Sequence, residues 1–287
     1  MDFKRISWIF LMVFSFLNIF LLTIYREADN EENVVYRADQ QIPIEDRLKS
    51  ENIKFAKSFS TQHPKGYYLS GKPTDLNQAL ADKREILGED SFLNASTSEN
   101  NEKLTYTIHD KKWLSEKKQV EAVLKNFLQQ EDQILFGQEY AYLADDSSFT
   151  KDYPFIVATQ SYENIPIDDS SSRLEIALEK QNENYLLLSY TQTHISDLIP
   201  LRESMKLYSE SEIIDTLYVN NKISNNATIE WTHLAYTLTL KVRGQNVYVP
   251  AWFVKIKKED GSIQIEKINA LTNRVITNSQ VQKVENT

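Results

Sequence analysis

An uncharged apolar run near the start of the chain constrains its fold more than any other feature. The run extends over Ile6–Tyr25 and reads ISWIFLMVFSFLNIFLLTIY. As a helix it would be about 30 Å long, which matches the hydrocarbon core of a bilayer. Lys4 and Arg5 precede it, whereas the segment 27–32 that follows is acidic. Because basic residues favour the cytoplasmic side, we expect a single-pass cell-membrane protein whose N-terminus is cytoplasmic and whose remaining chain is extracellular.

Two other interpretations of this run compete with a retained anchor. A cleaved signal peptide would have a shorter apolar region and small residues at its cleavage site. Here the run is bulky throughout and leads into Tyr25-Arg26-Glu27. A buried helix of a soluble protein is disfavoured, because no face of the run is polar. We therefore favour a retained anchor.

Polar side chains interrupt one side of this apolar run. Asn18 lies near its middle, and an amide in hydrocarbon is costly unless it finds a hydrogen-bond partner. Helical spacing places four more residues on the same face, so we expect this face to contact a partner helix. Alternatively, the Asn18 amide bonds locally and is simply tolerated. The predicted partner-binding face consists of Ser7, Leu11, Phe14, Ser15 and Asn18.

Composition limits what the rest of the chain can do. A net charge of −9 without a basic stripe argues against nucleic acid as a partner, and against docking of the outer region on anionic lipid. The chain has no cysteine, which excludes disulfides, thiolate metal sites and cysteine nucleophiles. Its aromatic and branched residues suffice for a globular extracytoplasmic region.

Periodicity predicts two successive units, each a helix followed by an antiparallel meander. In the first unit, the apolar stripe from Val120 to Leu128 predicts a helix over about 115–130, and four strand-like runs follow within 140–193. In the second unit, the capping box Ser209–Glu212 predicts a helix start. The alternation over Leu234–Val242 then predicts the first strand of a meander. We therefore expect an α+β fold.

These elements divide the chain into five predicted regions. They are a cytoplasmic start and transmembrane anchor (1–25), an acidic tether (26–41), a first α+β domain (42–199), a second α+β domain (200–277) and a polar tail (278–287). Within the first domain we also expect a helix over 42–50, a helix over 76–87 and a polar loop over 96–103. The expected core of the second domain comprises Ile213, Tyr236, Leu238, Trp252 and Phe253.

No set of residues has the spacing of a catalytic or metal site. The histidines are scattered, and no pair has the spacing of a zinc-binding helix. Asp145-Asp146 and Asp168-Asp169 invite comparison with two-carboxylate hydrolases. However, adjacent carboxylates point in different directions, and Asp commonly caps turns. We therefore expect no enzymatic activity, no cofactor and no metal. The histidines are His63, His109, His194 and His233.

Several segments are similar to one known family. They are Met1–Ile6, Trp8–Phe10, Leu17–Phe20, Ile44–Leu48, Gly66–Leu69 and Pro250–Val254. In this order they resemble the YycI (WalI) family, membrane-anchored accessory proteins of the WalK/WalR (YycG/YycF) two-component system in low-GC Gram-positive bacteria. The last unit also resembles a PepSY-like module, which often ends in a D-A-x-T-G-x-V-like turn. Asn269 and Asn273 stand in place of the Asp and Gly of that turn, so a role tied to the Asp charge is in question.

The resemblance implies a non-enzymatic regulator of cell-wall homeostasis. It implies association with a WalK-like sensor histidine kinase and a YycH-like partner, through the membrane helix and the extracytoplasmic region. The alternative, from another class, is an extracytoplasmic binding module for a wall polymer, peptide or protease. Genes for a kinase, a response regulator and a YycH-like protein immediately upstream would favour the regulator.

Overall fold

The computed structural model describes residues 42–115, 119–150 and 152–277, the backbone of 282–284, and a few positions near the start. Those positions are Trp8, Leu11, Phe14, Ser15, Leu17 and Asn18. The chain divides into two compact units, Met1–Asn52 and Ile53–Thr287.

In the first unit, the described positions of the apolar run are helical and exposed. Ser7, most of the remaining run and the predicted tether 26–41 lie outside the described residues. None of the helices in the described part of the chain combines the length and apolarity needed to cross a membrane. The transmembrane anchor therefore stays a prediction. Helix α2 (Ile44–Ser50) follows, with Pro43 at its N-cap and Leu48 buried, so the predicted helix over 42–50 is confirmed.

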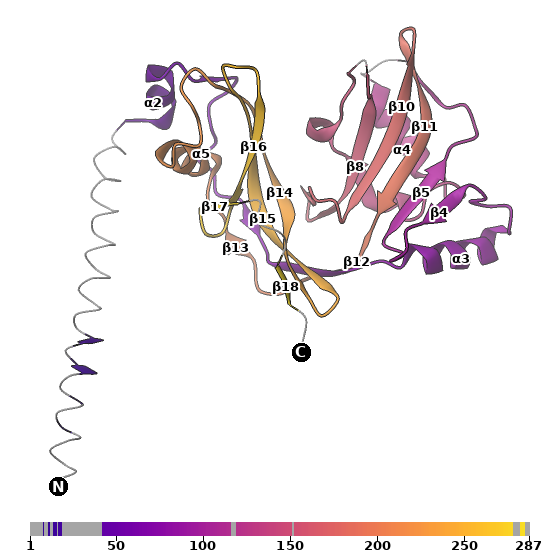
Figure 1. Ribbon diagram of the computed structural model, residues 1–287, viewed down its shortest axis with the longest axis horizontal. Helices are drawn as coiled ribbons and strands as arrows, with labels where there is room; N and C mark the ends of the chain where they lie inside the picture. Colours follow the sequence, from indigo (N-terminus) through magenta and orange to yellow (C-terminus); the bar gives the residue numbers. More distant parts are fainter. Residues whose placement is uncertain are drawn as a thin grey trace. The chain divides into compact units, whose positions relative to one another are not determined.

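The second unit contains a first antiparallel sheet, sheet 1, with the strand order β4-β5-β11-β10-β8-β7 (Figure 1). From β7 to β11 the strands follow one another along the path, so the predicted meander is confirmed. It follows helix α4 (Val120–Leu128), which begins later than the predicted start near 115. The strands are β4 (Ala95–Thr97), β5 (Lys103–Thr107), β6 (Trp113–Leu114), β7 (Tyr140–Tyr142), β8 (Phe155–Tyr162), β9 (Ile165–Pro166), β10 (Arg173–Gln181) and β11 (Asn184–Thr193).

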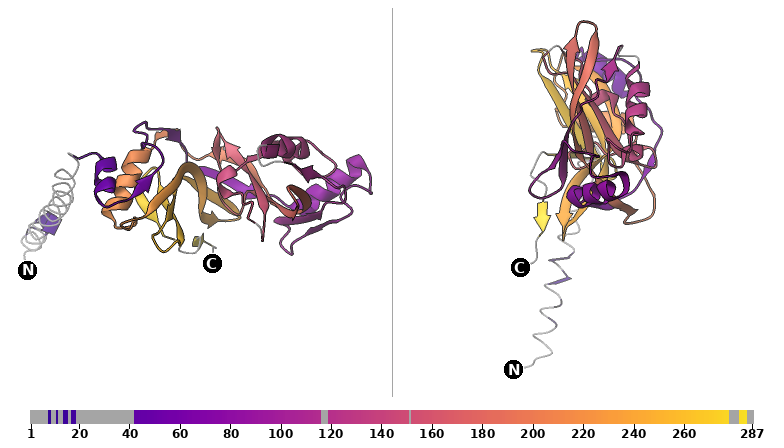
Figure 2. Two further views of the ribbon diagram at one scale, coloured as in Figure 1. Left: turned by 90° about the horizontal axis from the view of Figure 1, so that it is seen from above. Right: turned by 90° about the vertical axis from the view of Figure 1, so that its right-hand side faces the viewer.

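Helices α3 (Leu76–Leu87) and α4 supply apolar side chains to the core of sheet 1. The predicted helix over 76–87 is confirmed, and Asp75 caps it by accepting a hydrogen bond from the Gln78 N–H (2.9 Å). Leu80 of α3 and Phe127 of α4 belong to one buried cluster with Tyr190 of β11. The views in Figure 2 show α4 along one side of the strands. Sheet 1 is therefore an antiparallel sheet backed by helices.

One prediction in this region is wrong. The sequence predicts a loop over the polar segment 96–103, but the first two residues of this segment belong to strand β4. Ala95 of β4 lies opposite Tyr106 of β5 at one edge of the sheet. Backbone hydrogen bonds suffice to hold a short edge strand, so it needs no apolar alternation. Periodicity therefore gives no signal for it.

A second sheet, sheet 2, contains the path β1-β14-β15-β16-β17. β14, β15 and β16 form the predicted meander after helix α5 (Glu210–Val219), and β3 adds to β15 while also pairing with β12. β2 (Lys65–Gly66) and β13 (Met205–Lys206) pair separately. The strands of sheet 2 are β1 (Lys54–Phe55), β3 (Leu69–Pro73), β12 (Ile195–Pro200), β14 (Thr228–Val242), β15 (Gln245–Lys257), β16 (Ile263–Asn269), β17 (Arg274–Ile276) and β18 (Gln282–Val284).

Helix α5 is fixed at its N-terminus by the predicted capping box. The Ser209 hydroxyl accepts from the Glu212 N–H (3.4 Å), and the Glu212 carboxylate accepts from the Ser209 N–H (2.8 Å). The neighbouring Glu210 is buried; it accepts a hydrogen bond from the Ser60 N–H (2.9 Å) and another from the Thr232 hydroxyl of β14. Figure 2 shows α5, in orange, beside the strands of sheet 2.

The predicted core of this region needs a correction. Phe253 lies opposite His233, whereas Tyr236 lies opposite Pro250, so Phe253 and Tyr236 point to different faces of sheet 2. Tyr236 joins a buried cluster with Leu69, and Phe253 joins another. Sheet 2 is thus covered on both faces around Tyr236. The alternation of apolar and polar residues along one strand cannot show this, because that pattern is typical of a sheet with one face exposed to solvent.

Sheet 2 also combines segments that are distant in the sequence. β1 and β3 come from residues 54–73, and they pair with β14 and β15 of the C-terminal region. The α+β class, with mostly antiparallel sheets, is confirmed. The boundary near residue 200 between two domains stays a prediction.

Candidate functional site

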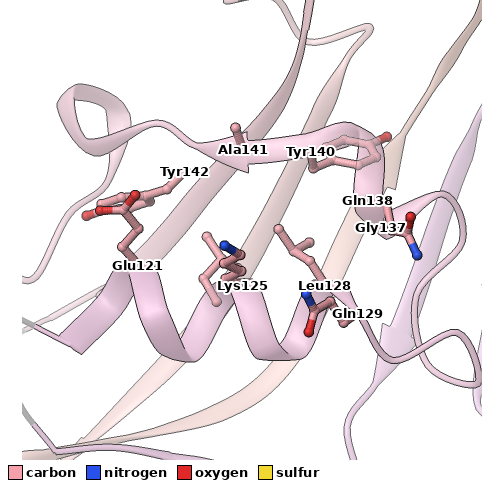
Figure 3. Close-up of a pocket in the computed structure, with 10 residues that line it drawn as sticks. Glu121, Lys125, Leu128, Gln129, Gly137, Gln138, Tyr140, Ala141 and Tyr142 are labelled. Atoms are coloured by element: carbon pink, nitrogen blue, oxygen red, sulfur yellow. The ribbon is translucent and has the colours of Figure 1, made fainter.

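A pocket of sheet 1 lies between helix α4 and strand β7 (Figure 3). It has a volume of about 570 Å³. Successive turns of α4 form one wall of the pocket, and residues of the segment Gly137–Tyr142 form the opposite wall. The lining residues are Glu121, Leu124, Lys125, Leu128, Gln129, Gly137, Gln138, Tyr140, Ala141 and Tyr142.

The apolar stripe of α4 explains the floor of this pocket. Leu124 and Leu128, one turn apart, are both buried, whereas Glu121 and Lys125 are exposed at the rim. Figure 3 shows Glu121 and Lys125 extending from α4 toward β7. The helix therefore presents apolar carbon inside and one charge of each sign at the opening.

Glycine is required where the chain turns from α4 into β7. A Cβ atom at Gly137 would lie 2.0 Å from the carbonyl oxygen of Leu128, which is closer than any real contact. The preceding residue, Phe136, has a φ of 52°, in the left-handed region. Gly137 thus lets the turn pass directly against the end of α4. This close approach holds β7 alongside the helix and shapes the pocket.

Strand β7 is an edge strand. Within the described residues, β8 is the strand that pairs with it, at Tyr140↔Gln160 and Tyr142↔Ala158. The Leu143 N–H donates to the Val157 carbonyl (2.9 Å), so Leu143 points its backbone groups toward β8. Because these directions alternate along a strand, Ala141 also faces β8, whereas Tyr140 and Tyr142 direct their backbone groups outward.

The two tyrosine side chains on this edge are held in different ways. The buried Tyr140 hydroxyl donates to the Thr193 carbonyl (2.5 Å), and burial raises the pKa of Tyr140. Burial also raises the pKa of Tyr142, and the negative charges of Asp145 and Glu121 add to this effect. Both phenols therefore stay neutral at physiological pH. The pocket combines an apolar floor, tyrosine side chains and outward backbone groups, an arrangement suited to holding a ligand.

The two aspartate pairs noted in the sequence converge in space, which the sequence did not reveal. His233 of β14 contacts Asp168 through Nε2 (3.1 Å) and Asp145 through Nδ1 (3.3 Å). Arg173 of β10 contacts Asp146 (2.6 Å). Burial raises the pKa of Asp146, and the nearby Asp168 raises it further, whereas Arg173 opposes this shift. The His233 contacts join β14 of sheet 2 to two loops of the sheet 1 region, whereas the Arg173–Asp146 ion pair lies within that region.

The remaining aspartate behaves as expected for a turn residue. Asp169 accepts hydrogen bonds from the N–H and the hydroxyl of Ser171 (2.9 and 2.7 Å). Within the described residues, no group of three or more His, Asp or Glu side chains could hold a metal ion. Each aspartate of the cluster therefore has a side-chain or backbone partner within the fold.

The other histidines take separate positions. His194 is buried; its Nδ1 lies 2.7 Å from the Thr74 hydroxyl, and its Nε2 lies 3.0 Å from Glu139. Burial lowers the pKa of His194, although Glu139 partly opposes this. His63 lies 2.9 Å from the Leu207 carbonyl oxygen. The structure thus gives these side chains local hydrogen-bond partners.

The predicted partner-binding face of the anchor lies partly within the described residues. Leu11, Phe14, Ser15 and Asn18 are helical and exposed, whereas Ser7 lies outside the described residues. The Asn18 side-chain amide donates to the Phe14 carbonyl one turn earlier (2.9 Å). Its role toward a partner stays a prediction.

The fold defines an α+β protein of two helix-backed, mostly antiparallel sheets, with a pocket at the edge of one of them. A family model described as YycI protein matches residues 31–271. The chain therefore belongs to the YycI family. No curated protein matches the chain.

One solved structure that matches the chain is that of an uncharacterized protein from Eubacterium rectale ATCC 33656, a crystal structure at 1.45 Å resolution. The match covers 79% of this chain and 91% of that chain, with 11% identity and a TM-score of 0.45.

Proposed function

We propose that this chain is a non-enzymatic, membrane-anchored regulator that associates with a WalK-like sensor histidine kinase and a YycH-like protein. In this proposal it adjusts the activity of the kinase and thereby cell-wall metabolism. The observation that carries it is the match of the YycI family model over residues 31–271. Ile6–Tyr25 forms the single membrane span, with a cytoplasmic N-terminus and an extracellular region that contains both sheets.

The proposed contact with the kinase uses one face of the membrane helix. Leu11, Phe14, Ser15 and Asn18 recur at the spacing of a single helical face and are exposed. The Asn18 side chain bonds to the Phe14 carbonyl through one N–H. A carboxamide has a second N–H and an acceptor oxygen, so this local bond leaves capacity for a partner helix. Local bonding and partner contact are therefore compatible.

The C-terminal region has a supporting role in this proposal. Residues 200–277 form a PepSY-like domain in which α5 backs the meander of β14, β15 and β16. The turn after β16 contains Asn273 with a φ of 54°, and Asn269 Oδ1 accepts from the Leu271 N–H (2.8 Å). Asn at these positions thus maintains the turn geometry without the charge of an aspartate.

The first test concerns Asn18. Asn18→Leu should reduce co-purification with the kinase roughly threefold and at most about 20-fold, because hydrogen bonds across membrane helices contribute about 0.6 and at most about 1.7 kcal/mol. Expression of wall-hydrolase genes should shift in parallel. Asn18→Gln, which keeps an amide, and Leu17→Val, on a neighbouring face, are the matched controls.

Replacement of the whole Ile6–Tyr25 run by an unrelated apolar helix should have a larger effect than Asn18→Leu. If the chain with the unrelated helix still bound and regulated the kinase normally, the native membrane helix would serve only as a tether. Recognition would then reside in the extracellular region.

The second candidate function is an extracytoplasmic binding module that acts without the membrane helix. The α4–β7 pocket favours it, because ligand sites are concave, mostly apolar and edged by a few polar groups. An isolated gene, without kinase and YycH-like neighbours, would favour this candidate over the regulator.

A further inference from the structure

The geometry points to the α4–β7 pocket as a binding site for an extended peptide segment of another protein, which adds to β7 as an antiparallel strand. The segment places alternate side chains over α4, in the order basic, acidic, apolar from its N-terminus. The site contains no residue of the membrane helix. It therefore goes beyond the proposed kinase contact and does not depend on it.

The backbone of β7 specifies an extended ligand. Tyr142 directs both its N–H and its C=O away from β8, and Tyr140 directs its C=O the same way, while its N–H donates to the Gly137 carbonyl. An open strand edge of this kind is a template for another strand. Strand addition supplies main-chain hydrogen bonds for affinity, and pockets for alternate side chains give specificity. A peptide residue opposite Tyr142 would complete two ladder hydrogen bonds.

The direction of the ligand follows from the directions of α4 and β7. Figure 3 shows Tyr142 at the Glu121 end of α4 and Tyr140 toward its Gln129 end, so β7 runs opposite to α4. A segment antiparallel to β7 therefore runs in the same direction as α4. Residues two apart on a strand are about 6.7 Å apart, and residues four apart on a helix rise about 6 Å. Successive inward side chains of the segment thus meet successive turns of α4.

The charges on α4 give the order of the side chains. The inward residue opposite Tyr142 meets the exposed Glu121 carboxylate, which favours a basic side chain. By this spacing the next inward residue, opposite Tyr140, lies one helical turn further along α4, toward Lys125, and the positive charge of Lys125 favours an acidic side chain. The third lies over the buried Leu128, where the pocket favours an apolar side chain.

The pocket has room for this ligand. Its volume of about 570 Å³ falls within the range of roughly 300–1,000 Å³ that is usual for ligand sites. Leu124 and Leu128 provide the apolar floor. Gly137 keeps β7 close to the end of α4, so the floor and the strand edge can be contacted by one peptide.

The natural absence of cysteine makes a disulfide-tethering test free of background. The probe is the peptide acetyl-Thr-Lys-Thr-Glu-Thr-Leu-Gly-Cys-amide. The full-length chain in detergent carries either Gln129→Cys, at the pocket, or Asn126→Cys, exposed on α4 outside the lining. Disulfide exchange under increasing thiol competitor is followed by intact-protein mass spectrometry. The probe should be retained about tenfold better on Gln129→Cys than on Asn126→Cys.

Two altered probes test the stated chemistry. Exchanging the Lys and Glu of the probe should lower retention on Gln129→Cys, because like charges would then meet on α4. Methylating the backbone nitrogen of the probe lysine should lower it about tenfold, because the hydrogen bond to the Tyr142 carbonyl is lost. Equal retention at both cysteine positions, or indifference to N-methylation, would overturn the proposal. Preferential formation of disulfide-linked pairs of the chain through Gln129→Cys would overturn it too, in favour of a second copy as occupant.

A protein variant provides an independent test. Tyr142→Pro removes the outward N–H and leaves the pairing with β8 intact, since proline is tolerated at an edge strand whose N–H faces away. Tyr142→Leu also lacks the ring but keeps the N–H. In the Gln129→Cys background, Tyr142→Pro should retain the probe several-fold less well than Tyr142→Leu, and equal retention would contradict strand addition. If Tyr142→Pro does not fold, the N-methylated probe tests the same hydrogen-bonded edge.

Discussion

Helices α4 and α5 each precede an antiparallel meander, yet they are built differently. The N-terminus of α5 is closed by the Ser209–Glu212 box, and its buried Glu210 is hydrogen-bonded to backbone and side chain. The N-cap residue of α4, Gln119, makes no capping hydrogen bond through its side chain, and the helix borders an open pocket. The comparison shows that the same order of elements, a helix followed by a meander, can give a capped helix at α5 and a helix that borders an accessible pocket at α4.

Core truncation should distinguish the two helices most strongly. Leu217 of α5 and Leu124 of α4 are both buried, but Leu124 also lines the pocket. Leu217→Ala should cost about 4 kcal/mol, and Leu124→Ala about 2 kcal/mol, because the cost rises with the new empty volume and the Leu124 site is already open on one side. Urea unfolding of the full-length chain measures both. An equal or larger loss for Leu124→Ala would mean that α4 is as tightly packed as α5.

Removing the caps should give the next largest difference. Ser209→Ala should cost about 1 kcal/mol, since the Glu212 N–H loses its acceptor and the reciprocal bond loses its partner. Gln119→Ala at the matched position of α4 should change the unfolding free energy by less than about 0.5 kcal/mol. A comparable cost at Gln119 would show that α4 is capped after all.

The smallest expected effect concerns how the free energy of unfolding depends on pH through His194, which follows the last strand of sheet 1. Burial lowers the pKa of His194 in the folded chain, so below its unfolded value the unfolded chain binds more protons. His194 therefore contributes a loss of stability as the pH falls from neutral into the acidic range. The unfolding free energy of His194→Gln should depend less on pH than that of the unaltered chain between pH 7.5 and 5. The raised pKa of Asp146 acts in the opposite direction, but equally in both proteins.

Local sequence signals predicted those elements whose own residues determine them. The helix over Leu76–Leu87 and the Ser209–Glu212 capping box are confirmed because spacing and capping are local properties. β4 was missed because an edge strand is held by its neighbour's backbone. The shared core of Tyr236 and Phe253 was wrong because strand alternation does not show that a sheet is covered on both faces.

The candidate site was harder to predict than the fold. The apolar stripe of α4 was identified, but the pocket depends on where β7 lies, which the α4 sequence does not encode. Gly137, one of only six glycines, was the available signal for a close approach. Likewise, the Asp145 and Asp168 pairs meet through His233, about 65–90 residues further along the chain. Such convergence follows from sheet pairing, not from spacing.

The pairing of β1 with β14 has a consequence for how the chain is made. Lys54 lies opposite Thr228, and Leu69 lies opposite Tyr248, so roughly 175 residues separate these partners. At a synthesis rate of about 5–20 residues per second, β1 waits roughly 10–35 s for β14, and the edge of β3 that pairs with β15 waits equally long. All strands of sheet 1 emerge within that interval. Sheet 1 can therefore be complete while β1 and this edge of β3 are still unpaired, and a chaperone acting on the nascent chain would find its substrate in those early strands.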